Sequence, residues 1–151
     1  MGLITDINAI LTQLYPDATH FLSSKFRANI NSFNAAASAF PLIIIDNEIT
    51  KDNEIKANAN VMKSTGIVIS FYNLDDMDNT DTQSNAIVEA MEVYADRTAA
   101  QIYQLLPVRP DTRQTYRVTP DFHAYSTNLT GAILDMTVNY NSIVNFAMPE
   151  A

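Results

Sequence analysis

One stretch of helical periodicity, from about Thr80 to Leu106, limits the folds that this chain can adopt. Its apolar stripe recurs every three or four positions, and Asp81 in the first turn suits the positive end of the helix dipole. Pro107 enforces the end of the helix. The stripe consists of Ile87, Met91, Tyr94, Thr98, Ile102 and Leu105. The segments on either side of this helix must therefore supply the apolar surface that covers the stripe.

Strand patterns stand both before and after the long helix. The β-branched run 41–46 is typical of a strand buried on both faces, near the middle of a sheet, and residues 64–73 predict a second strand. After the helix, residues 114–125 predict a strand that Pro120 restricts to an edge or a bend. The closing strand, 134–140, alternates apolar and polar residues, so one of its faces meets the core.

The remaining elements complete an α+β order. Residues 1–15 predict an amphipathic helix that stops before Pro16, and residues 16–39 predict a loop followed by a short helical turn. Helices and strands do not alternate as they would in a doubly wound parallel sheet. We expect one α+β domain over residues 1–151, with an antiparallel sheet of about four or five strands, the long helix packed across one face, and an N-terminal helix.

Composition excludes several classes of protein. The 151 residues contain no cysteine, which excludes disulfides, zinc–thiolate sites and thiol nucleophiles. The longest apolar run, 40–45, is too short to span a membrane, and the N-terminus lacks the basic region of a secretory signal. A net charge of −8 argues against binding to nucleic-acid phosphates. We therefore expect neither membrane association nor specific nucleic-acid binding.

The sequence carries no recognisable catalytic motif. His20 and His123 each stand without a second ligand at metal-binding spacing, so we expect a loop histidine and an exposed strand histidine. Gly2, Gly66 and Gly131 are too dispersed to cradle a phosphate, and no serine lies in a Gly-x-Ser-x-Gly context. The expected protein is not an enzyme and uses no cofactor.

An acidic cluster precedes the long helix. It consists of Asp75, Asp76, Asp78 and Asp81, without the glycine turn and bidentate glutamate of a calcium loop, so helix capping is the preferred interpretation. A small hydrolase or ligand-binding enzyme that uses Asp75, Asp78 and His123 is a minor alternative. It requires these three side chains to converge in one pocket with perturbed pKa values.

Two polar segments are candidates for contacts with other subunits. Residues 49–61 predict a projecting loop or an exposed hairpin. Arg109 and Arg113 flank Asp111 after the long helix, and these charges either pair with a neighbouring subunit or remain solvated. The candidate interface residues are Lys51, Asp52, Glu54, Lys56, Arg109, Asp111, Arg113 and Arg117.

The layout resembles that of the tail-terminator and neck (head–tail joining, tail-completion) proteins of tailed bacteriophages. The resemblance spans nearly the whole chain. It includes the N-terminal helix, the Phe-Pro-Leu-Ile-Ile-Ile-Asp strand entry at 40–46, the strand at 65–72, the long helix, and a closing strand that begins with Asn-Leu-Thr-Gly at 128–131.

The resemblance implies a structural virion protein made in the host cytoplasm and located at the neck or tail. Such subunits form a ring, here expected to have six or twelve copies, through which DNA passes without specific binding. Their partners are copies of themselves and other virion proteins such as portal, adaptor or tail-tube proteins. Residues 49–61 are then candidates to reach a neighbour or the lumen, and 107–113 a subunit seam. The alternative is a non-enzymatic interaction or assembly module that binds a partner at its sheet edge.

Overall fold

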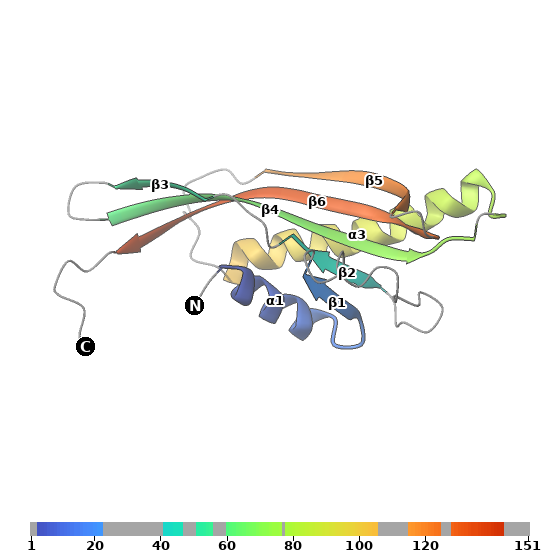
Figure 1. Ribbon diagram of the computed structural model, residues 1–151, viewed down its shortest axis with the longest axis horizontal. Coiled ribbons are helices and arrows are strands. Elements are labelled where there is room, and N and C mark those ends of the chain that lie inside the picture. Colours follow the sequence, from blue (N-terminus) through green and yellow to red (C-terminus); the bar gives the residue numbers. More distant parts are fainter. Residues whose placement is uncertain are drawn as a thin grey trace.

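The computed structural model describes residues 3–22, 41–46, 51–55, 60–76, 78–105, 115–124 and 128–143. These residues form two layers, a long twisted sheet and a pair of helices against one of its faces (Figure 1). In chain order the elements are α1 (Leu3–Leu14), β1 (Thr19–Leu22), β2 (Leu42–Ile45), β3 (Lys51–Ile55), β4 (Asn60–Leu74), α3 (Asp81–Leu105), β5 (Tyr116–Ala124) and β6 (Leu129–Ile143). The α+β class, the N-terminal helix and the long helix across one face are confirmed.

The sheet has six strands in the order β1-β2-β4-β6-β5, and β3 pairs with the first residues of β4. Every pair is antiparallel except β1 with β2, which is parallel. The extra strands relative to the prediction are β1, in a segment expected to be a loop, and β3, in the expected projecting segment. β5 lies at an edge, and its register with β6 shifts between Asp121 and Ala124, just after Pro120.

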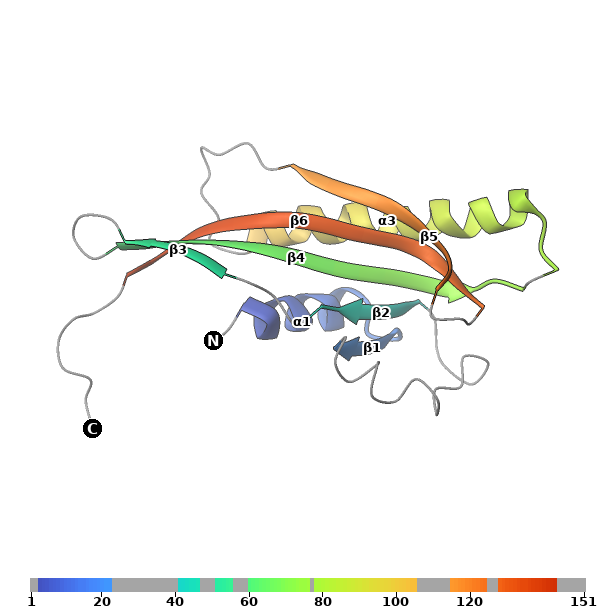
Figure 2. The same ribbon diagram turned by 45° about the horizontal axis from the view of Figure 1, so that its top comes forward.

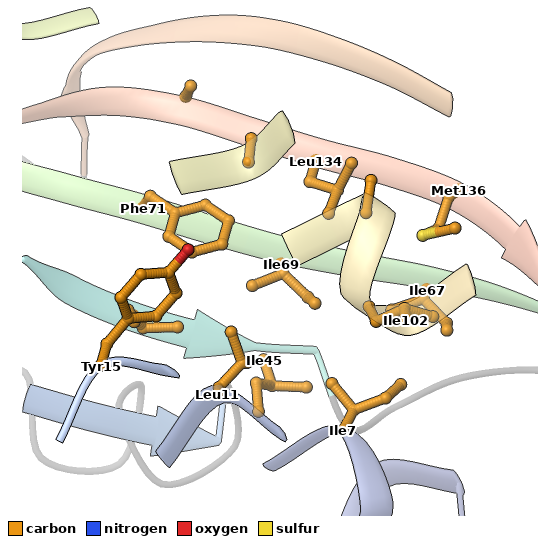
Figure 3. Close-up of a cluster of buried hydrophobic side chains, with 14 of the residues drawn as sticks. Ile7, Leu11, Tyr15, Ile45, Ile67, Ile69, Phe71, Ile102, Leu134 and Met136 are labelled. Atoms are coloured by element: carbon orange, nitrogen blue, oxygen red, sulfur yellow. The ribbon is translucent and has the colours of Figure 1, made fainter. Parts of the chain in front are cut away.

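The main core lies between the sheet and the two helices. Ile7 and Leu11 of α1, Ile69 and Phe71 of β4, and Ile102 of α3 are all buried there (Figure 3). Burial of each large apolar side chain contributes about 1.5–3 kcal/mol, so this layer is the main source of stabilisation by apolar burial among the described residues. The alternation predicted for the closing strand is confirmed, because its apolar members join this core while the polar residues between them stay exposed: Leu134, Met136 and Val138 against Asp135 and Thr137.

A smaller apolar cluster occupies the opposite face of the sheet. Leu42 and Ile44 of β2 pack there with Tyr72 and Leu129. Because Ile43 and Ile45 of the same strand face the helices, all four residues of β2 are buried, as the apolar run predicted.

Gly131 permits a close approach between β4 and β6. A Cβ atom added there would overlap the backbone carbonyl of Phe71. The register aligns Tyr72, Gly131 and Asp121 across three strands, and Tyr72 Oη donates a hydrogen bond to Asp121 Oδ2 at 2.6 Å. The missing side chain thus also lets the Tyr72 hydroxyl reach across β6.

A capping box begins α3. Thr80 Oγ1 accepts a hydrogen bond from the Gln83 backbone N–H at 3.3 Å, and Gln83 Oε1 accepts one from the Thr80 N–H at 2.8 Å. These two bonds satisfy backbone donors that the helix itself leaves unpaired. Thr80 and Gln83 therefore cap α3. The sequence had instead predicted that the neighbouring aspartates cap this helix.

Candidate functional site

A three-stranded arm extends the sheet beyond both helices (Figure 1, Figure 2). We define the arm as β3 together with residues 60–64 of β4 and 139–143 of β6. It begins where Thr65 and Val138, which are paired and fully buried, mark the end of the core. The backbone register continues without a shift from that pair to Asn60 opposite Ile143. The predicted projecting hairpin is thus one edge of a longer structure.

The four predicted interface residues that the structure describes lie on two edges of the sheet. Lys51, Asp52 and Glu54 lie on β3, which flanks β4 in the arm. Arg117 lies on β5, which flanks β6 on the opposite side, and it is exposed. The other four candidates lie outside the described residues: Lys56, Arg109, Asp111 and Arg113.

The edge formed by α3 and β5 exposes aromatic side chains. Tyr116 and Phe122 are 45% and 46% exposed. Tyr116 Oη donates a hydrogen bond to Asp96 Oδ1 at 2.8 Å, and this bond, with burial and the aspartate's charge, raises the pKa of the Tyr116 hydroxyl. Phe122 borders a shallow pocket of about 420 Å³ beside the first turns of α3, together with Asp81, Ser84, Asn85 and His123. Sequence reasoning did not identify this surface, because its members come from two elements.

A buried carboxylate ties three elements together at the end of the sheet opposite the arm. Asp75, directly after β4, is 0% exposed. It accepts hydrogen bonds from Asn79 Nδ2 at 2.7 Å, from Ser84 Oγ at 2.8 Å and from Thr130 Oγ1 at 2.7 Å. Burial alone would raise the pKa of Asp75, but these hydrogen bonds outweigh it and hold the pKa below its usual value. The carboxylate therefore joins the ends of β4, α3 and β6.

His123 lies against this carboxylate in a strained backbone conformation. Its Nε2 is 3.5 Å from Asp75 Oδ2, and its side chain is 34% exposed. Its φ of 49° is in the left-handed region, which costs a non-glycine residue on the order of 1 kcal/mol. The backbone N–H of His123 donates to Thr130 Oγ1 at 3.1 Å, which helps to hold that conformation. His123 lies in a strand as expected, but it is half-buried rather than exposed because it faces Asp75 at a bulge.

The cluster lacks the arrangement that nucleophilic catalysis requires. Ser84 Oγ donates its hydrogen bond to Asp75, whereas a serine nucleophile would have to donate to an imidazole that acts as its base. Asp78 is exposed in the turn before α3, so the structure brings together two of the three residues of the minor enzyme alternative. Within the described part of the chain, no three His, Asp or Glu side chains are placed to hold a metal ion. The cluster is suited to fixing the fold at this end.

Comparison of the sequence with models of protein families and with curated proteins finds no match. No helix in the described part of the chain is long and apolar enough to cross a membrane.

Proposed function

We propose that this chain is a structural, non-enzymatic subunit of a ring at the neck or tail of a tailed-bacteriophage virion. The observation that carries the proposal is the arm, which projects from a helix-covered core as an extension of the same sheet (Figure 2). An element of this kind is suited to reach an adjacent subunit. The layout that resembles tail-terminator and neck proteins, with an N-terminal helix and a long helix across one face, supports the same function.

Sheet energetics explain why the arm needs a neighbour. Three short strands without a packed layer are marginally stable in water, and the free edge of a strand carries unpaired N–H and C=O groups. A second subunit that covers the arm would stabilise it and shield these groups. Repetition of one such head-to-tail contact closes into a ring when the rotation between subunits allows it. An interface that holds a ring of six or twelve copies should bury at least about 1,000 Å².

The acidic character of the chain supports passage of DNA without specific binding. Seventeen acidic residues against nine basic ones give a net charge of −8. A lumen with this sign repels phosphates, so DNA can move through it without being held. Portal, adaptor or tail-tube proteins are the proposed neighbours above and below the ring.

The first experiment is the solution mass of the purified chain by light scattering, with negative-stain images of the same sample. Closed rings of six or twelve copies are the expected result. The measurement is repeated over a concentration series, because ring closure depends on concentration. A protein that stays monomeric to its solubility limit contradicts a self-assembling ring.

The alternative function is an interaction or assembly module that binds one partner at its sheet edge. The exposed residues of β5, an edge strand, favour it. The two functions differ in stoichiometry. Co-purification of the chain in a one-to-one complex with a different protein, without rings, would support the module.

A further inference from the structure

The side of α3 that faces away from the core carries a valine between two opposite charges. Val93 is 55% exposed, more than any other large apolar side chain in the described part of the chain. Glu89 lies four positions before it and Arg97 four positions after it, and both are exposed. At 3.6 residues per turn the three side chains fall within about 80° of arc. Met91 and Ile102, which are buried in the core, lie on the opposite side of the helix.

Two further apolar positions continue this line in both directions. Ala86 and Ala100 lie seven positions before and after Val93, and both are exposed. Residues seven positions apart are almost in line along a helix, which is the spacing at which two helices pack lengthwise. We call the exposed residues Ala86, Glu89, Val93, Arg97 and Ala100 the α3 face.

The two charges of the α3 face have no opposite charge beside them on their own helix. Residues three and four positions apart are neighbours on a helix surface. None of the residues at these spacings from Glu89 is basic, and none at these spacings from Arg97 is acidic. Asp96 is next to Arg97 in the chain, but it accepts a hydrogen bond from Tyr116 on the β5 side of the helix. A second molecule can therefore supply the opposite charges.

We infer that the α3 face binds the α3 face of a second copy of this chain, antiparallel and around a two-fold axis at Val93. In such a contact each residue meets the one that lies equally far from Val93 in the other direction. Glu89 of each copy then meets Arg97 of the other, and Ala86 meets Ala100. A parallel pair would instead place Glu89 beside Glu89 and Arg97 beside Arg97, so the charges select the antiparallel arrangement.

This contact goes beyond the proposed ring, because a two-fold contact joins two copies and cannot close a ring. One helix pair is smaller than most stable interfaces, which bury more than about 1,000 Å², so the free subunits should associate only weakly. Between two stacked rings the same contact would be repeated for every subunit, and repeated weak contacts bind strongly. Two rings of six copies joined in this way would contain twelve copies.

Disulfide cross-linking tests the axis at Val93, because the chain has no cysteine of its own. A disulfide requires two Cα atoms about 4.4–6.8 Å apart, which identical residues of two antiparallel copies reach only near the axis. On oxidation with copper phenanthroline, Val93→Cys should form dimers about tenfold faster than Thr119→Cys, an exposed control on the sheet face opposite the helices. Equal rates for the two variants overturn the inference.

Ala86→Cys and Ala100→Cys test the antiparallel register. Each variant alone should cross-link no faster than the Thr119→Cys control. A mixture of the two, with a mass tag on one of them, should form mixed dimers at the rate of Val93→Cys. If Ala86→Cys links to itself as fast as to Ala100→Cys, the copies do not pair antiparallel and the inference is wrong.

A charge exchange in the Val93→Cys background tests the two ion pairs. Glu89→Arg alone, or Arg97→Glu alone, should slow cross-linking several-fold, because like charges then meet across the axis. A mixture of these two variants restores opposite charges at both contacts and should recover the original rate. Arg97 also lies near the Tyr15 hydroxyl, so this recovery distinguishes lost attraction from a damaged fold. A mixture that links as slowly as its components, or single variants that link at the original rate, overturns the inference.

The cross-linking rates do not depend on ring formation, so this inference and the proposed function can fail separately. Cross-linking through Val93→Cys without rings in negative-stain images contradicts the ring and leaves the α3 contact standing. Rings whose Val93→Cys subunits link no faster than the control contradict the α3 contact and leave the ring standing.

Discussion

Strands β4 and β6 pass through two different environments along their length. In the core, Ile69 and Leu134 are buried beneath the helices, so their pairing is reinforced by apolar packing. In the arm, the same two strands continue with β3 beside them and extend past both helices (Figure 2). Core pairing should therefore determine the stability of the isolated subunit, whereas arm pairing should matter for assembly. Variants in the two regions test this difference.

The largest effect is expected from Gly131→Ala. The added methyl group would overlap the Phe71 carbonyl. The central β4–β6 pair, which carries core residues, would therefore have to shift. We expect a loss of at least about 3 kcal/mol in the free energy of unfolding, measured by urea denaturation. A loss below 1 kcal/mol, on the same order as for a surface substitution, would show that the core tolerates a shifted pair.

Ile69→Ala tests the contribution of core packing. The side chain is fully buried between β4 and the helices, so its removal should leave a cavity and cost about 2–5 kcal/mol. Thermal unfolding monitored by circular dichroism measures the change. The matched control is Val93→Ala on the exposed side of α3, which should change stability by less than about 0.5 kcal/mol.

Asp75→Asn tests how much one carboxylate stabilises the end of the core opposite the arm. The variant loses the charge that Ser84 and Thr130 stabilise, so we expect a cost of about 1.5–3 kcal/mol at pH 7. Because the pKa of Asp75 is lowered by folding, its contribution is fully present above the unfolded value of about 4 and is lost as pH falls through the folded pKa. Urea denaturation between pH 7 and pH 2 should therefore show a smaller acid-induced loss of unfolding free energy in the variant than in the wild type. Parallel pH profiles for both proteins would contradict this role.

The smallest effect on the subunit is expected from Asn53→Pro in the arm. Proline fixes φ near −65°, well away from the value of about −140° in an antiparallel strand, so it disturbs the pairing of β3 with β4, where Asn53 is opposite Lys63. Subunit stability should fall by less than about 1 kcal/mol, because this pair lies outside the core. Light scattering should nevertheless show fewer rings. If Asn53→Pro lowered stability as much as Ile69→Ala and left the rings intact, the proposed difference between arm and core would be wrong.

The elements that are marked by an apolar pattern or by a proline could be predicted from the sequence. The apolar run of β2, the stripe of α3 and the position of Pro120 in an edge strand each depend on local patterns that the structure preserves. β1 was missed because its four residues, Thr19–Leu22, are all half-buried and carry no alternation. The full length of β4 was missed because Asn60, Lys63 and Ser64 interrupt the apolar pattern in its first residues, and backbone pairing does not require an apolar pattern.

The candidate surfaces were only partly predictable. The polar composition of residues 49–61 indicated a projecting hairpin, and β3 lies there. The contact between Asp75 and His123 depends on a bulge in β5 and on the pairing of β5 with β6, so no spacing in the sequence reveals it. The hydrogen bond between Tyr116 and Asp96 likewise forms only because the fold brings β5 beside α3.

The pairing of β4 with β6 also determines when this chain can fold. β4 is complete before α3 begins, but its long partner β6 is the last of the described strands, so α3 and β5 must be synthesised before the central ladder can close. Contacts between such distant segments make folding slow, typically milliseconds to seconds, and leave strand edges open in the meantime. The arm ends of β4 and β6 are the most distant partners in this ladder. A ribosome-bound chain that has not yet released residues 129–143 is therefore the form most exposed to aggregation.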